Sequence, residues 1–84
     1  MRIYMQQHAP GEPLRFYQLQ LQPDLLGGWA LIRESGVQGQ RGQVRQEYFQ
    51  QREEAEQALI RLRDRQLRRG YRVVFREGSH QEAG

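Results

Sequence analysis

The spacing of the apolar residues changes twice along the chain, and this constrains the fold more than any other feature. The stretch "RFYQLQLQ" at residues 15–22 alternates apolar and polar side chains, as in a strand with one buried face and one wet face. From about Gln51 the apolar residues stand three and four positions apart, which predicts a helix. The stretch "YRVVF" at residues 71–75 returns to alternation. Strands, one helix and a last strand are therefore expected.

The predicted helix has an apolar stripe and marked ends. The stripe consists of Ala55, Ala58, Leu59 and Leu62. Glutamates near the start and arginines near the end complement the helix dipole. We expect Gly70 to end the helix, whereas Gln51 is a weak N-cap compared with Ser or Asp.

Further strands are expected on both sides of a glycine-bearing loop, in "WALIRE" and "QVRQEYF", which together predict an antiparallel hairpin. "RIYMQQHA" at the start predicts a short edge strand. The expected fold class is α+β, an antiparallel β-sheet of four to five strands with one α-helix packed across it. A chain of 84 residues has room for one core, so we expect a single domain at residues 1–76 and a flexible C-terminal tail at 77–84. We further expect Tyr71, Val73 and Phe75 to face inward and Phe16 to lie outside.

The glycine-rich loop "GVQGQRGQ" does not match the known phosphate-binding patterns. A P-loop needs a Lys-Ser/Thr pair and a helix directly after it, and the dinucleotide pattern needs a different glycine spacing. "GQRG" matches the G-x-x-G of KH domains, but that loop joins two helices and this one joins two predicted strands. We interpret the loop as a structural turn formed by Gly36, Gly39, Gly42 and Gln43.

The sequence offers little for catalysis. There is no Cys, His8 and His80 lie near opposite ends, and no group of residues has metal-ligand spacing. We expect no enzyme activity, no cofactor, no metal and no small-molecule substrate. No apolar run approaches the roughly 20 residues of a membrane span, and the first residues lack the apolar middle of a signal peptide. A cytoplasmic protein without membrane contact is therefore expected.

All thirteen basic residues are Arg, whose planar guanidinium suits phosphates. Genome base composition explains the same bias, and both explanations stay open. The candidate nucleic-acid-binding residues are Arg33, Arg41 and Arg45 in the predicted hairpin, with Arg69 and Arg72 flanking the helix end. Another stripe on the helix comprises Arg61, Arg65 and Arg68. For this stripe we favour a solvated helix face.

Two stretches of the chain resemble the WGR domain, a module of DNA-dependent poly(ADP-ribose) polymerases and of small free-standing bacterial proteins. They are "RFYQLQLQPDLLGGWALIRESGVQGQRGQVRQEYF" and "EEAEQALIRLRDRQLRRGY". The likeness extends from about Met1 to Phe75 and implies an antiparallel sheet crossed by one helix. It also implies nucleic-acid binding without catalysis.

The Trp-Gly-Arg triplet that names the family aligns with Ser35, Gly36 and Val37, so only the glycine is kept. The resemblance implies that the Trp stacks at a DNA end and that the Arg supports DNA contacts. Ser35 cannot stack and Val37 carries no charge. Two hypotheses follow: a weak, phosphate-contacting nucleic-acid-binding module, with duplex DNA or its ends as partner, or a protein-interaction adaptor that has lost DNA binding.

Overall fold

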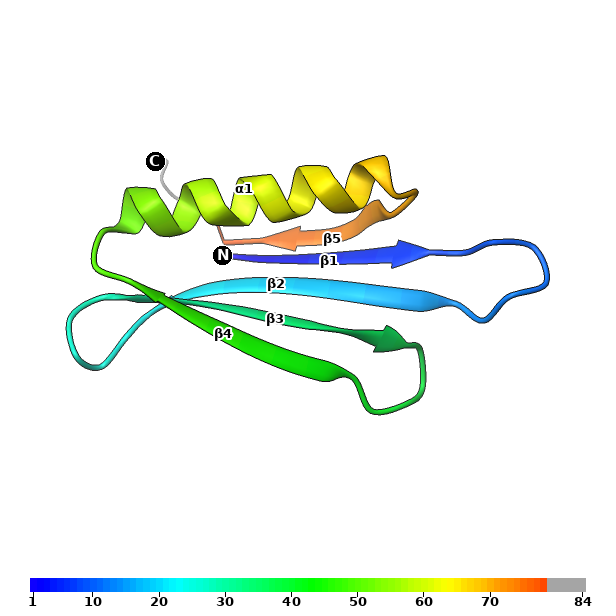
Figure 1. Ribbon diagram of the computed structural model, residues 1–84, viewed down its shortest axis with the longest axis horizontal. Coiled ribbons are helices and arrows are strands. Elements are labelled where there is room, and N and C mark those ends of the chain that lie inside the picture. The colour runs from blue at the N-terminus through cyan, green and yellow to red at the C-terminus, as the bar shows by residue number, and fades with distance from the viewer. Residues whose placement is uncertain (79–84) are drawn as a thin grey trace.

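The structure, a computed structural model, describes residues 1–78. Its elements follow the chain in the order β1 (Arg2–Gln7), β2 (Arg15–Pro23), β3 (Trp29–Val37), β4 (Gln43–Phe49), α1 (Arg52–Arg68) and β5 (Arg72–Glu77). The strands form one sheet in the order β4-β3-β2-β1-β5, and every neighbouring pair is antiparallel. The helix crosses one face of this sheet (Figure 1). The predicted α+β class is thus confirmed.

The ends of α1 follow local sequence, as predicted. Gln51 is the N-cap and its side chain makes no capping hydrogen bond. At the other end Gly70 adopts a φ of 97°, a left-handed conformation that glycine reaches at low cost. The Gly70 N–H donates to the Leu67 carbonyl at 3.1 Å, and the Tyr71 N–H donates to the Gln66 carbonyl at 2.9 Å. This pair of bonds satisfies the last carbonyls and stops the helix.

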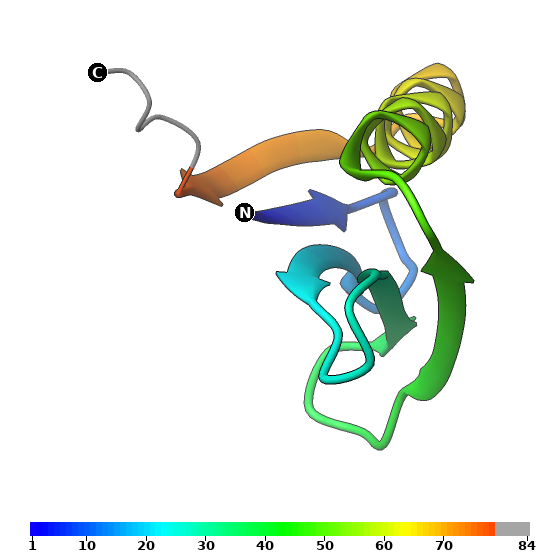
Figure 2. The same ribbon diagram turned by 90° about the vertical axis from the view of Figure 1, so that its left-hand side faces the viewer.

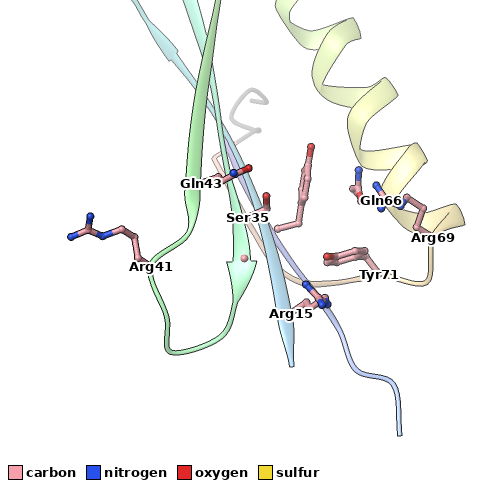
Figure 3. A pocket seen from close by; sticks show the side chains of 9 residues that line it. Arg15, Ser35, Arg41, Gln43, Gln66, Arg69 and Tyr71 are labelled. Atoms are coloured by element: carbon pink, nitrogen blue, oxygen red, sulfur yellow. The ribbon is translucent and has the colours of Figure 1, made fainter. Parts of the chain in front are cut away.

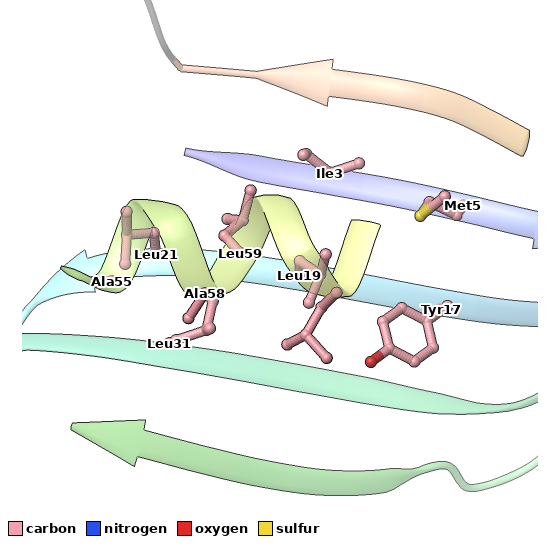
Figure 4. Packing of buried hydrophobic residues seen from close by; sticks show 10 residues of the cluster. Ile3, Met5, Tyr17, Leu19, Leu21, Leu31, Ala55, Ala58 and Leu59 are labelled. Carbon is pink, nitrogen blue, oxygen red and sulfur yellow. The ribbon is translucent and has the colours of Figure 1, made fainter. Parts of the chain in front are cut away.

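The core lies between α1 and the face of the sheet that curves around it (Figure 2). Alternate residues of the three inner strands point to this face, and the apolar stripe of α1 packs on them (Figure 4). The largest fully buried side chains are Met5, Leu19, Leu31 and Leu59. The period-two and helical patterns read from the sequence therefore meet in one layer of apolar contacts.

The position of the first strand differs from the prediction, because β1 is not an edge strand. After α1 the chain returns to the sheet and β5 pairs with β1, so β1 lies between β2 and β5. β5 also extends to Glu77, one residue beyond the domain end that we predicted. The predicted tail from residue 79 onward lies outside the described residues.

The inward burial predicted for Tyr71, Val73 and Phe75 is confirmed only at Tyr71, which precedes β5. Tyr71 is half-buried and packs against the core, whereas Val73 is exposed and Phe75 is 44% exposed. The register between β1 and β5 shifts by one residue, so that Met5 pairs with Val73 but Tyr4 pairs with Phe75. This irregularity reverses the alternation, and Phe75 shares the face of Tyr4, away from α1.

Phe16 is buried, contrary to our prediction, on the sheet face away from α1. Its ring stacks on Tyr4 with centroids 6.2 Å apart. A Cβ at Gly42 would lie 2.9 Å from the Phe16 ring and 2.8 Å from the Ser35 carbonyl oxygen, and a Cβ at Gly36 would lie 3.0 Å from the Gly42 Cα. Gly36, which lies in β3 rather than in the turn, and Gly42 thus leave room for an aromatic ring, while Gly39 supplies a φ of 86° at the turn.

Replacing Gly42 by alanine should lower the free energy of unfolding by about 1–3 kcal/mol, because the new methyl group collides with backbone and with a buried ring. Urea unfolding followed by circular dichroism measures this loss. Gly39→Asn is the matched control, since Asn tolerates the left-handed region and no atom lies within 4 Å of a Cβ there. Equal losses in both variants would refute the steric explanation.

Candidate functional site

Two hollows lie between α1 and the β3–β4 hairpin. One of them, which we call the middle hollow because it lies beside the middle of α1, has a volume of about 250 Å³. Its charged lining residues are Arg33, Glu47, Arg61 and Arg65. The end hollow, of about 300 Å³, lies at the C-terminal end of the helix. Its polar lining comprises Arg15, Ser35, Arg41, Gln43, Gln66 and Arg69, with Tyr17 and Tyr71 as its aromatic walls.

The hollows lie next to one another, because their lining residues are neighbours on both the sheet and the helix. Ser35 of the end hollow pairs with Gln43, and the next pair on the same face is Arg33 with Arg45. Arg65 and Arg69 stand one helical turn apart. We call this surface the basic groove and define it by seven arginines: Arg15, Arg33, Arg41, Arg45, Arg61, Arg65 and Arg69.

Strand alternation explains why the sheet arginines face the helix. Leu31 is buried in the core, so Arg33 and Ser35, two and four residues further along β3, point to the same face. Arg45 points to the same face as well, because it pairs directly with Arg33 across the two strands. On this face, the sheet therefore carries apolar side chains where α1 covers it and arginines beyond the part that α1 covers.

The groove arginines lack internal ion pairs. Within residues 1–78 the ion pairs are Arg2–Glu77 at 3.1 Å, Arg52–Glu56 at 2.8 Å and Arg63–Asp64 at 2.9 Å, and none includes a groove arginine. Glu47 lines the middle hollow and offsets part of the charge there. The arrangement leaves a positive field open to an anionic partner.

The structure brings together four of the five arginines selected from the sequence. Arg41 and Arg69 line the end hollow, Arg33 lines the middle hollow and Arg45 pairs with Arg33. Arg72 lies in β5, at the opposite edge of the sheet from β4, outside the groove.

Some groove residues were missed or differently interpreted from sequence. Arg61 and Arg65, interpreted as part of a solvated helix face, line the middle hollow. Arg15 was missed, although its alternation with Tyr17 places it on the helix-facing side. Gln66 was also missed. Figure 3 shows Gln66 and Arg69 across the end hollow from Ser35, while the Arg41 side chain points away from the helix.

Residues 1–78 contain no group of three His, Cys, Asp or Glu side chains placed to hold a metal ion. His80, named in the sequence analysis, lies outside the described residues. Within the described part of the chain, no helix has the length and apolar character needed to cross a membrane.

The fold and the groove together define a small single-sheet α+β module with a basic groove beside its helix. The family model of the WGR domain matches residues 1–78, and the chain belongs to the WGR domain family. The uncharacterized protein y4dW of Sinorhizobium fredii is 32% identical over 72 residues, which cover 84% of this chain and 35% of that protein. The chain thus spans about a third of the length of this relative. No solved structure matches the chain.

Proposed function

We propose that the protein is a non-enzymatic nucleic-acid-binding module of the cytoplasm that holds the phosphate backbone of duplex DNA in the basic groove. The observation that carries this proposal is the set of seven arginines in one groove, none of them in an ion pair within residues 1–78. Guanidinium groups match phosphate oxygens in geometry and charge. Membership in the WGR family supports the same function and a helix-on-sheet packing typical of that family.

The contacts in this groove are expected to be to phosphates rather than to bases. Ser35 stands where the family triplet has its Trp, and the exposed Tyr48 lies on the other face of the sheet, because it pairs with Ala30 rather than with a core-facing residue. Binding through phosphates alone is insensitive to sequence and depends strongly on salt. The proposed partner is therefore duplex DNA of any sequence.

Fluorescence anisotropy with a labelled blunt duplex, titrated between about 50 and about 200 mM salt, tests the proposal. The logarithm of the binding constant should fall linearly with the logarithm of salt concentration, with a slope of about −0.9 for each phosphate contacted. Polyglutamate is the control, since it offers negative charge without phosphate geometry. Absence of duplex binding at low salt, or equal competition by polyglutamate, would contradict the proposal.

One observation favours a protein-interaction adaptor as a second candidate. Leu25 and Leu26 are fully exposed at the β2–β3 turn, and hydrogen bonds from the Leu26 N–H to Asp24 Oδ2 at 3.1 Å and from the Asp24 N–H to the Gly28 carbonyl at 2.8 Å hold this turn in shape. Exposed apolar pairs of this kind are typical of protein contacts. Failure of the duplex titration, together with a dimer in light scattering, would favour this candidate instead.

A further inference from the structure

Gln66 is a buried polar residue without a side-chain partner. It is 3% exposed, and among the described residues it is the one polar or charged residue that is buried. Its main-chain carbonyl accepts bonds from the Arg69 and Tyr71 N–H groups. Its side-chain amide, in contrast, makes no hydrogen bond to any group within residues 1–78. The side chain lines the end hollow, so this hollow is where the amide can find a partner.

An apolar side chain would suit the position better if it served only the core. Residue 66 follows Leu59 and Leu62 on the face of α1 that packs on the sheet. Among residues 1–78 the fully buried side-chain atom without a partner is Arg2 Nε, so the Gln66 amide keeps access to solvent in the end hollow. Leucine has a similar helix propensity and no polar group that needs such access. The amide is therefore available to a polar group that enters the hollow.

The walls of the end hollow indicate the chemistry of that group. Arg15 and Arg69 line it without ion pairs in the described part of the chain, and two guanidinium groups in one hollow suit a phosphate dianion. The half-buried ring of Tyr71, in edge contact with Tyr17 at 5.9 Å, offers an apolar wall. The volume of about 300 Å³ is at the lower end of small-ligand sites, the size of a mononucleotide rather than of a longer chain.

We propose that the end hollow binds a free nucleoside monophosphate. Arg15 and Arg69 hold its phosphate, and the Gln66 amide, which both donates and accepts, pairs with the polar edge of its base or with a sugar hydroxyl. The phosphorylated end of a nucleic-acid strand carries the same chemical group, and the experiment separates the two sources. This ligand was not expected from the sequence. Arg15 and Arg69 also belong to the basic groove, so this proposal assigns a ligand to one end of that groove; it is tested apart from duplex binding, since nucleotide binding is measured without DNA.

Isothermal titration calorimetry of the whole chain with the four ribonucleoside monophosphates, inorganic phosphate, adenosine and a 5′-phosphorylated duplex tests the proposal. At least one monophosphate should bind more tightly than inorganic phosphate, and adenosine should not bind. Gln66→Leu should weaken the nucleotide about tenfold and leave inorganic phosphate unchanged. The same substitution should raise the melting temperature by about 4–8 °C, the shift for roughly 1 kcal/mol in a domain of this size.

Arginine variants complete the design. Arg69→Gln should weaken both nucleotide and inorganic phosphate, whereas Arg68→Gln, which removes the same charge from an exposed neighbour that lines neither hollow, should weaken neither. The proposal is overturned if no monophosphate binds, or if inorganic phosphate binds as tightly as the nucleotides. It also falls if Gln66→Leu lowers the melting temperature without changing nucleotide affinity. Binding of a 5′-phosphorylated duplex alone would assign the hollow to strand ends and overturn the free ligand.

Discussion

Replacing Arg45 and Arg65 together by glutamate should reduce the affinity for duplex DNA about a hundredfold at low salt. Both side chains are exposed and lie on opposite walls of the basic groove, Arg45 on β4 and Arg65 on α1. Each substitution removes an attractive charge and adds a repulsive one beside the DNA, and a single charge-assisted hydrogen bond contributes about 1.5–3 kcal/mol. The salt slope should also become shallower by about 0.9 for each phosphate that the variant no longer neutralises.

The matched control is Arg72→Glu with Arg76→Glu. These two arginines are exposed on β5, at the far edge of the sheet, and the change in net charge is identical. If binding follows the groove, the control keeps most of its affinity and its salt slope. Equal reductions in both double variants, measured by the same anisotropy titration, would show that net charge rather than the groove holds the DNA.

Leu59→Ala should lower the free energy of unfolding by about 2–5 kcal/mol, the range for deleting a buried leucine side chain. Leu59 is 2% exposed and lies in the centre of the stripe by which α1 packs on the sheet. Small domains have about 5 kcal/mol of stability at the lower end of the usual range, so the variant is expected to be close to unfolding. Urea denaturation followed by circular dichroism gives the difference.

Leu67→Ala, the same substitution in the last turn of the same helix, is the control for packing. Leu67 is 42% exposed, so little apolar area is returned to water and a decrease below about 1 kcal/mol is expected. Comparable decreases for Leu59→Ala and Leu67→Ala would contradict the view that burial against the sheet causes the loss; helix propensity cannot explain such decreases, because alanine is the better helix former.

Much of the fold was predictable from the sequence because it depends on local patterns. The helix and its end at Gly70 follow from apolar spacing and from a residue that adopts positive φ at low cost. The hairpin follows from alternation on both sides of a glycine loop. Even the shared face of Arg33 and Arg45 follows from strand parity, once the hairpin is accepted.

The wrong predictions concern places where distant segments meet. The position of β1 inside the sheet depends on β5, which pairs with it only after the helix has crossed the sheet. The exposure of Phe75 results from a one-residue register shift between these strands. The burial of Phe16 depends on Tyr4 from another strand and on two glycines that leave space for its ring.

The sequence by itself determined the elements of this protein, the positive charge of its hairpin and its membership in a family, because period, capping and composition act between residues close in the chain. The tertiary structure decided that the arginines of the helix and of the hairpin line one groove, since the angle at which α1 crosses the sheet is set by packing across the whole core. It also decided that Gln66, an ordinary polar residue in the sequence, is buried with its amide facing a hollow. Burial is a property of every segment that surrounds a residue, and no local pattern contains it.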